Sequence, residues 1–169
     1  MRIGLYRRDS DVPQEQEDLL MATLQEKRVA VVPMTDYEKY EGSEKLDYVF
    51  SIGGDGTLLS AVHQIGESQV PIVGINYGHL GFLTSAGKGD VRLFVKDFLE
   101  GRFSVETRSL LHVDFPQLPE QSTYVLNEVY IHRNQGQSLV HTEVYVNDEY
   151  VATYQADGVI VATPPGSTA

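Results

Sequence analysis

The chain has 169 residues, of which 41% are hydrophobic, so it can bury the core of one domain or of two small ones. Its 13 basic and 24 acidic side chains give a net charge of −11, which disfavours nucleic acid as a partner but permits a small phosphorylated ligand held by backbone amides. Cysteine is absent, which excludes disulfides and a thiolate zinc site, and with no signal-peptide pattern and no apolar run of ~20 residues we expect a soluble, cytoplasmic protein that binds no membrane.

Residues 1–101 alternate between strand and helix patterns. Short apolar runs predict strands over residues 3–6, 29–32, 48–52 and 70–75. The second run is continuous, which is typical of a strand covered on both faces. Strands that alternate with helices imply a parallel sheet with helices on both sides.

Three helices are predicted between these strands. The first follows Pro13 and has an acidic first turn and a basic end. The second follows residue 57, where apolar residues recur at helical spacing, and it ends at Gly66. The third is capped by Asp90 and ends at Gly101.

After Gly101 the pattern becomes β-rich. Strand-forming residues dominate 103–115, 123–132, 139–146 and 150–163, with a hairpin turn at 147–149. We therefore expect an α/β domain over residues 1–101 and a partial β-rich domain over 102–169. The final turn leaves a sheet edge open, so we expect the sequence to be part of a longer chain.

The turn Gly53-Gly54-Asp55-Gly56-Thr57 lies between a predicted strand and a predicted helix. Its glycines allow a tight turn and a close approach to a ligand, and the helix start offers N–H groups to phosphate. Asp55 would stand at the carboxyl end of the strand, where open α/β sheets bind ligands. The alternative is a structural turn with an aspartate cap.

A second glycine-rich segment, residues 76–83 (Asn-Tyr-Gly-His-Leu-Gly-Phe-Leu), follows the next strand and is expected at the same sheet edge. Its His79 is assigned no chemistry. In Leu126-Asn127-Glu128-Val129, Asn127 and Glu128 can serve one cleft only if the backbone bends, because strand neighbours point to opposite faces. The alternative is a polar pair on an edge strand.

A fourth segment begins at Asp157-Gly158 and runs through an apolar strand into Thr163-Pro-Pro-Gly-Ser-Thr-Ala169. The last turn can present amides and hydroxyls to a sugar or a base. The alternative is a β-turn in which a serine or threonine is a cap.

These four segments, in this order, resemble the NAD kinase family, and the resemblance runs from residue 48 onward. The Gly-Gly-Asp-Gly-Thr turn is shared with diacylglycerol and sphingosine kinases and, more distantly, with phosphofructokinases. The other three segments are much more specific to NAD kinases. The resemblance implies transfer of the γ-phosphate of ATP, bound with Mg²⁺ or another divalent cation, to the 2′-hydroxyl of the adenosine ribose of NAD. It also implies a homo-oligomer.

The resemblance assigns roles to particular residues. Asp55 matches the general base, and Gly56 belongs to the same dinucleotide-contacting turn. The remaining implied NAD contacts are Asn127, Glu128, Asp157, Thr168 and Ala169, with weaker matches at Ser138 and Gln155. No protein side chain is assigned as a metal ligand. We expect Asp55 to share one pocket with Asn127, Glu128 and Asp157.

The sequence departs from the family in two places. Pro165 stands where the family has threonine or serine, which removes a hydroxyl and a backbone donor. The sequence also ends at Ala169, before the tyrosine and glycine-rich continuation of the family, which predicts weak binding or no activity for this part alone. Two other functions stay open, a lipid kinase and a non-catalytic dinucleotide-binding module.

Overall fold

The computed structural model describes residues 1–8, 13–34, 45–77, 81–84, 89–134 and 138–168. The chain forms two compact units. The first consists of Met1–Thr107 and Asp114–Tyr124, and the second of Arg108–Val113 and Val125–Ala169. Within the described ranges, none of the helices has the length and apolar character needed to cross a bilayer. The division into 1–101 and 102–169 stays a prediction.

The first unit is built on a four-stranded parallel sheet with the strand order β2-β1-β3-β4. The strands are β1 (Arg2–Arg7), β2 (Ala30–Met34), β3 (Tyr48–Ile52) and β4 (Ile72–Ile75). The chain turns from β1 to β2 on one side and then to β3 on the other. The change of direction between β1 and β3 is the place where ligands bind in open α/β sheets, at the carboxyl ends of the strands.

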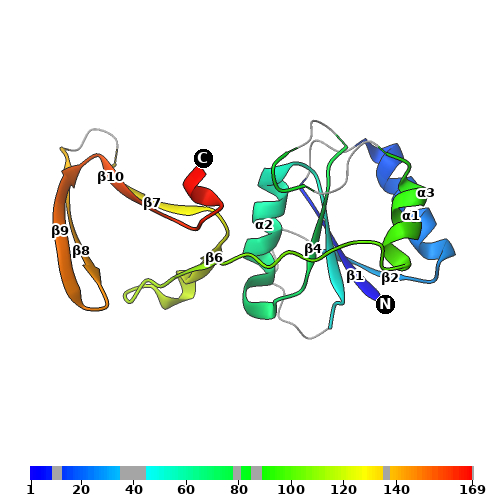
Figure 1. The fold of residues 1–169 in the computed structure, drawn as a ribbon, viewed down its shortest axis with the longest axis horizontal. Coiled ribbons are helices and arrows are strands. Elements are labelled where there is room, and N and C mark those ends of the chain that lie inside the picture. Colours follow the sequence, from blue (N-terminus) through cyan, green and yellow to red (C-terminus); the bar gives the residue numbers. More distant parts are fainter. Residues whose placement is uncertain (9–12, 35–44, 78–80, 85–88, 135–137, 169) are drawn as a thin grey trace. The chain divides into compact units, whose positions relative to one another are not determined.

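Helices cover both faces of this sheet. Helices α1 (Gln14–Glu26) and α3 (Val91–Leu99) lie on one face, and α2 (Asp55–Ile65) lies on the other (Figure 1). A short 3₁₀ helix, η1 (Gly66–Ser68), follows α2. The predicted α/β architecture and its helix positions are therefore confirmed.

Strand alternation divides the core of the first unit into two clusters. On the α1/α3 face, Phe50 is fully buried, and its ring centroid lies 5.7 Å from that of Phe94 and 5.0 Å from that of Phe98. On the α2 face, Tyr6 and Val49 pack against one side of the helix. Successive residues of each strand point to opposite faces, so each strand contributes to both clusters.

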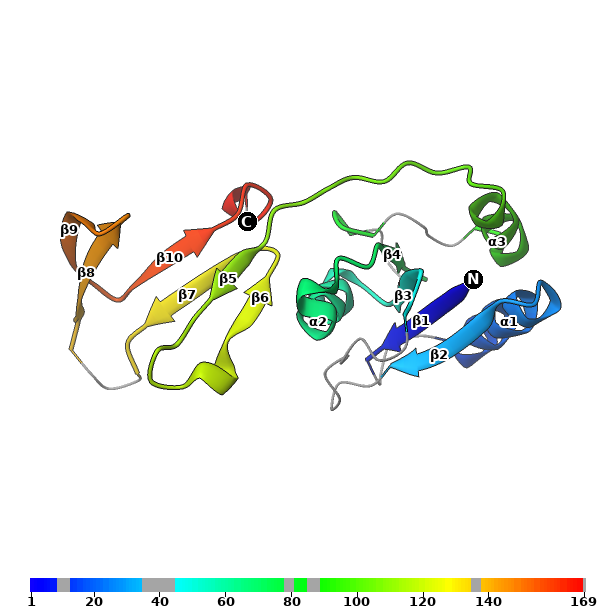
Figure 2. The ribbon, with the colours of Figure 1, turned by 90° about the horizontal axis from the view of Figure 1, so that it is seen from below.

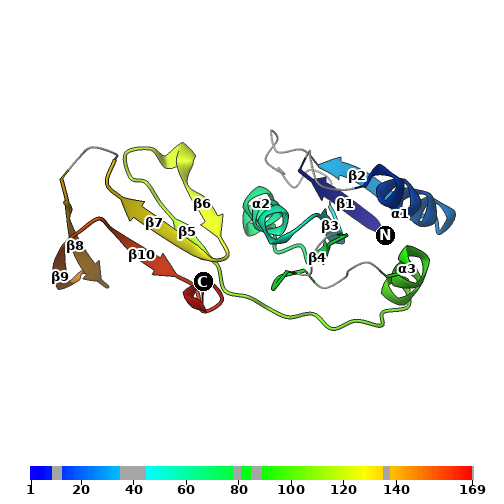
Figure 3. The same cartoon turned by 90° about the horizontal axis from the view of Figure 1, so that it is seen from above.

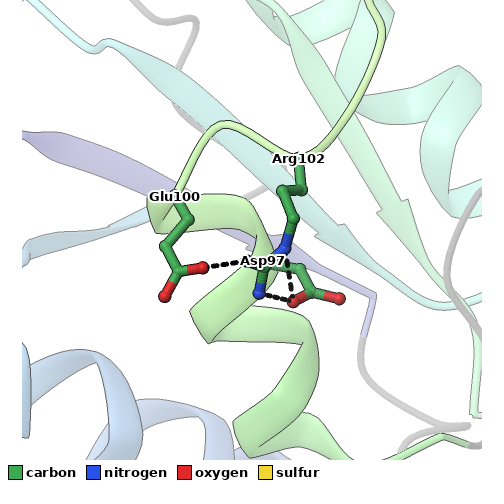
Figure 4. A network of polar contacts seen from close by, with 3 residues as sticks. All are labelled: Asp97, Glu100 and Arg102. Atoms are coloured by element: carbon green, nitrogen blue, oxygen red, sulfur yellow. Dashed lines mark hydrogen bonds and ion pairs between the residues drawn. The ribbon is translucent and has the colours of Figure 1, made fainter.

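Helix α3 ends as the sequence predicts. The Asp90 side chain accepts a hydrogen bond from the Arg92 N–H at 2.8 Å and caps the start. At the other end Gly101 has φ +70°, and the Arg102 N–H donates to the Asp97 carbonyl at 2.9 Å, as in a Schellman motif. The Arg102 guanidinium pairs with the carboxylates of Asp97 and Glu100 (Figure 4), and the hydrogen bond to Asp97 is the main cause that raises the pKa of Arg102.

The second part of the chain consists of strand pairs, and the pairs formed from residues 128–132 with 158–162 and from 140–146 with 149–156 are antiparallel (Figures 2 and 3). Strand β5 (Leu111–Val113) pairs with β6 (Thr123–Val125), and the short helix η2 (Pro119–Gln121) lies between them in the sequence. The other pairs are β7 (Glu128–His132) with β10 (Gly158–Ala162), and β8 (Val140–Val146) with β9 (Glu149–Ala156). A further short helix, η3 (Gly166–Thr168), follows β10.

The β8–β9 hairpin turns through Asn147 and Asp148, whose φ angles are +52° and +66°. Two consecutive left-handed residues make the tight turn that matches the twist of paired strands, and asparagine and aspartate tolerate this conformation best after glycine. The predicted hairpin is confirmed.

Two strand predictions differ from the structure in detail. Strand β2 lies at the edge of the sheet and none of its residues is fully buried, although Val31 packs against the core cluster on the α1/α3 face and Val32 and Met34 pack against the cluster on the α2 face. The residues of 103–115 form a strand only over Leu111–Val113, because most of the segment has no strand beside it. Apolar content alone does not reveal whether a neighbouring strand is present.

Candidate active site

The Gly-Gly-Asp-Gly turn lies at the carboxyl end of β3, next to the change of direction in the sheet. Gly53 has φ +147°, a conformation that side chains rarely adopt, and its N–H donates to the Ile75 carbonyl at 2.9 Å. A Cβ at this position would lie 2.4 Å from the Thr57 hydroxyl oxygen. Glycine is thus required at 53, and the chain can enter α2 directly, with Asp55 as its first residue.

The carboxylate of Asp55 joins the first two glycine-rich segments. Its Oδ2 accepts a hydrogen bond from the Phe82 N–H at 2.9 Å, and its Oδ1 accepts one from the Leu83 N–H at 3.1 Å. A Cβ at Gly81 would lie 2.1 Å from Asp55 Oδ1, so the close approach depends on glycine there. The prediction that both segments meet at one edge of the sheet is confirmed for residues 81–83.

The loop that donates to Asp55 is held by a further hydrogen bond to a buried side chain. The Gly81 N–H donates to the hydroxyl of Thr84 at 3.3 Å, and Thr84 is buried. Residues 78–80, including His79, lie outside the described residues.

Two glycines of the turn face open space. A Cβ added at Gly54 or at Gly56 would meet no atom within 4 Å, and neither residue has a positive φ. Among the described residues, then, nothing requires glycine at these two positions. Asp55 is half-buried, and a carboxylate retains lone pairs after accepting one hydrogen bond on each oxygen. The turn therefore has room for a ligand directly beside a fixed carboxylate.

In the second unit, the backbone bends at residues 126–127, as it must if the side chains of Asn127 and Glu128 are to serve one cleft. Strand β6 ends at Val125 and β7 begins at Glu128, so the two residues do not lie in one continuous strand. Glu128 Oε2 is buried and has no hydrogen-bond partner among the residues that the structure describes. A buried carboxylate oxygen without a partner is costly, and a ligand hydroxyl or amide would satisfy it.

The turn after β10 packs against Asn127. The Asn127 carbonyl accepts a hydrogen bond from the Thr163 N–H at 2.8 Å. A Cβ at Gly166 would lie 2.2 Å from that same carbonyl oxygen. The third and fourth sequence segments are thus brought together. Thr168 belongs to η3, and Ala169 lies outside the described residues.

Asp157 lies at the opposite end of the β7–β10 pair. Glu128 is in register with Ala162, whereas His132 is in register with Gly158. The two ends are roughly 14 Å apart, since an antiparallel strand rises about 3.4 Å per residue. The Asp157 carboxylate accepts a hydrogen bond from Arg133 Nε at 2.6 Å, and the Arg133 N–H donates to the Asp157 carbonyl at 3.0 Å.

The two weaker predictions, Ser138 and Gln155, are both exposed. Ser138 precedes β8, and Gln155 lies on β9 in register with His141. Asp55 belongs to the first unit and Asn127, Glu128 and Asp157 to the second, so their shared pocket stays a prediction.

Tyr77, in the second glycine-rich segment, has a buried phenol whose oxygen lacks a hydrogen-bond partner within the described ranges. Burial, and then the nearby charge of Glu17, raise its pKa above 10.0, so it remains a neutral hydroxyl near neutral pH. Glu17 in turn accepts a hydrogen bond from Arg7 Nη1 at 2.8 Å.

Sequence patterns missed two groups beside the predicted residues. Arg133 pairs with Asp157, and no signal in the sequence indicated this. The hydroxyl of Thr163 contacts the backbone of Asn127, and a threonine directly before Pro-Pro is a turn signal that could have pointed to it.

A parallel sheet with helices on both faces and a fixed carboxylate at an open glycine turn is the arrangement of phosphate- and nucleotide-binding α/β proteins. Residues 10–103 match the ATP-NAD kinase N-terminal domain, and residues 126–169 match the ATP-NAD kinase C-terminal domain. The chain belongs to the NAD kinase family.

Several curated relatives carry the name NAD kinase. The protein of Porphyromonas gingivalis is 46% identical over 126 residues, which is 75% of this chain and 43% of that protein. The protein of Acidithiobacillus ferrooxidans is 40% identical over 125 residues, 73% of this chain and 42% of that protein. The chain therefore spans less than half the length of these relatives.

Two solved structures share the fold. A yeast NADH kinase complexed with NADH aligns with a TM-score of 0.76 at 20% identity, covering 99% of this chain and 59% of the other. An NAD kinase from Archaeoglobus fulgidus in complex with ATP aligns with a TM-score of 0.75 at 26% identity, covering 99% of this chain and 63% of the other.

Proposed function

We propose that this chain contributes the catalytic carboxylate and part of the dinucleotide site of an ATP-dependent NAD kinase, which converts NAD to NADP. The observation that carries the proposal is the Asp55 carboxylate, held by two backbone N–H groups beside two open glycines, in a chain that matches both NAD kinase domains. Relatives of that name, and a structural relative bound to ATP, support the same substrates.

In the proposed reaction Asp55 acts as the general base. A ribose hydroxyl is a weak nucleophile, and a carboxylate within hydrogen-bond reach takes its proton as the new bond to phosphorus forms. The oxygen of the 2′-hydroxyl bonds to the γ-phosphorus of ATP while the bond to the β-phosphate oxygen breaks, and ADP leaves. The hydrogen bonds from Phe82 and Leu83 fix the orientation of the base, and much of the acceleration of phosphoryl transfer comes from such alignment.

The remaining residues are proposed to bind the dinucleotide. Asn127 and Glu128 stand at the backbone bend, where the buried Oε2 of Glu128, which has no hydrogen-bond partner among the described residues, is suited to accept a hydrogen bond from a ribose hydroxyl or an amide. Asp157 stands about 17 Å further along the β7–β10 pair, five residues from Ala162, and this separation suits an elongated ligand with a nucleoside at each end. The other proposed contacts are Gly56, Thr168 and Ala169, and, with less support, Ser138 and Gln155.

Mg²⁺ is proposed to arrive as its complex with ATP, because Mg²⁺ binds phosphate oxygens and commonly keeps several waters. In the part of the chain that the structure describes, no group of three or more His, Asp or Glu side chains is placed to hold a metal ion. No step of the proposed reaction is assigned to a metal ligand of the protein.

Assembly, location and the domain division are also proposals. The strands of the second unit expose several large apolar side chains, which supports association into a homo-oligomer. They include Tyr130, Ile131, Tyr145, Tyr150, Ile160 and Val161. The acidic, cysteine-free composition supports a cytoplasmic location. The change of pattern at Gly101 supports a boundary between an α/β part (1–101) and a β-rich part (102–169).

One assay tests the activity. The full-length protein is incubated with Mg-ATP and NAD, and NADP is measured with an NADP-specific dehydrogenase, in parallel with a diacylglycerol reaction. NADP formation that requires ATP is expected. Phosphorylated diacylglycerol without NADP would indicate a lipid kinase. NAD binding without either product would indicate a non-catalytic module.

A further inference from the structure

We propose that Thr163 is a positioning residue for the dinucleotide, which holds the backbone at Asn127 and the turn at residues 164–168 in one fixed arrangement. The inference rests on the proposed function, because it concerns how two of the proposed binding segments are held relative to each other. Thr163 itself is 3% exposed and is not among the proposed ligand contacts.

The Thr163 hydroxyl connects three backbone groups. It donates its single proton to the Leu126 carbonyl, with the Asn127 carbonyl as a second acceptor at 3.0 Å. It accepts a hydrogen bond from the Gly166 N–H at 3.2 Å. One buried hydroxyl thus serves both the bend before β7 and the turn after β10.

The bend needs such a partner because Leu126 and Asn127 lie between two strands. Strand β6 ends before them and β7 begins after them, so neither residue belongs to a strand ladder that would satisfy its carbonyl. Buried backbone carbonyls are costly to leave unpaired. The N–H and the hydroxyl of Thr163 take the place of a strand neighbour at this point.

The turn at 164–168 is also held by hydrogen bonds between its own residues. The Ser167 N–H donates to the Thr163 carbonyl at 3.0 Å, and the Ser167 hydroxyl donates to the Pro164 carbonyl at 2.8 Å. Gly166 packs so closely on Asn127 that a Cβ would lie 2.2 Å from its carbonyl oxygen and 2.8 Å from its Cα. A shift of the turn therefore changes the position of Asn127, and a shift of Asn127 changes the turn.

This coupling gives Thr163 a functional consequence. The side chain of Asn127 and the residues of the turn are proposed to contact the same dinucleotide, and a misplacement of about 1 Å is enough to weaken a set of directed contacts substantially. Because Thr163 acts only through these neighbours, its loss should weaken NAD binding and leave KM for ATP unchanged.

The test compares three variants of the protein. Thr163→Val keeps the shape of the side chain and removes the hydroxyl. Thr163→Ser keeps the hydroxyl and removes the methyl group. Thr153→Val makes the same chemical change on exposed strand β9 and is the matched control. KM for NAD, KM for ATP, kcat and the dissociation constant of NAD by calorimetry are measured for each, together with thermal unfolding.

We expect Thr163→Val to raise KM and the dissociation constant for NAD about tenfold or more, the size expected when buried polar groups lose their partner, with KM for ATP unchanged. KM and the dissociation constant for NAD of Thr163→Ser should stay within about threefold of the wild-type values. Those of Thr153→Val should equal the wild-type values. If Thr163→Val does not fold, Gly166→Ala, which displaces the turn and leaves the hydroxyl in place, should show the same selective loss of NAD affinity.

Unchanged NAD affinity in folded Thr163→Val, or an equal loss for NAD and ATP, would overturn the inference. Equal defects in the serine and valine variants would do the same, because the hydroxyl would then not matter. Failure of the proposed function gives a different result: the wild type itself would form no NADP. If that wild type still binds NAD, the calorimetric comparison tests Thr163 by itself, and if it does not, the inference is rejected with the function.

Discussion

Replacing Asp55 with asparagine separates the structural and chemical roles of its carboxylate. The carboxylate accepts hydrogen bonds from the N–H groups of Phe82 and Leu83. An amide offers one acceptor oxygen and turns an NH₂ group toward the other N–H, so one bond is lost. A hydrogen bond to a charged group contributes about 1.5–3 kcal/mol, and for a half-buried site we expect the lower end, a loss of about 1–2 kcal/mol of unfolding free energy.

The catalytic effect should be much larger than the structural one. Loss of a general base typically lowers turnover by about 10²–10⁴-fold, whereas NAD binding through the second unit should persist. Urea unfolding, kcat and calorimetric NAD binding are measured on the same preparations. Asp90→Asn is the control, because Asp90 accepts one backbone N–H at the start of α3 and asparagine caps a helix equally well.

Retained turnover in folded Asp55→Asn would refute the assignment of Asp55 as the base. A turnover loss accompanied by complete loss of NAD binding would instead show that Asp55 acts mainly in binding. Unchanged unfolding free energy would show that the two N–H groups find other partners.

Three further predictions concern the first unit. Gly81→Ala places a methyl group where it would lie 2.1 Å from Oδ1 of the base, so kcat should fall about tenfold or more in a folded protein, and a wild-type kcat would show that the loop does not position the base. Phe50→Ala should lower the unfolding free energy by about 3–5 kcal/mol, because the ring is fully buried, and a loss below about 1 kcal/mol in urea unfolding would contradict the described core. A hydrogen bond to Glu67 is the main cause that raises the pKa of Tyr124 to about 12. The contribution of this phenol to the free energy of unfolding is therefore present below pH 10.0 and lost as the pH rises toward about 12. The tyrosinate absorbance that wild type gains at high pH, and that Tyr124→Phe lacks, should appear at lower pH in Glu67→Gln.

Local signals predicted the elements of the first unit well. The helix between Asp90 and Gly101 was predicted from its cap, its apolar stripe and its terminal glycine, and the structure has α3 at Val91–Leu99. Such signals act over a few residues and need no knowledge of the rest of the chain. The edge position of β2 was not predictable in this way, because an apolar run has the same composition whether one neighbouring strand or two lie beside it.

The β-rich part was harder to predict for the same reason. The structure breaks 123–132 at Leu126 and Asn127, and it breaks 150–163 at Asp157. Both breaks fall at proposed binding residues, and functional sites are the places where a structure most often departs from local strand propensity. Motif resemblance indicated the importance of these positions, but it gave no geometry for them.

The sequence by itself determined the order of strands and helices, the glycine positions of the turns and the family to which the chain belongs. Only the tertiary structure decided that Asp55 is held by N–H groups 27 and 28 residues away, and that the Thr163 hydroxyl reaches carbonyls 37 and 36 residues away. The physical reason is that a hydrogen bond depends on positions to within a few tenths of an ångström. Composition and periodicity specify which residues favour a strand or a turn, whereas these distances follow from the path of the whole backbone.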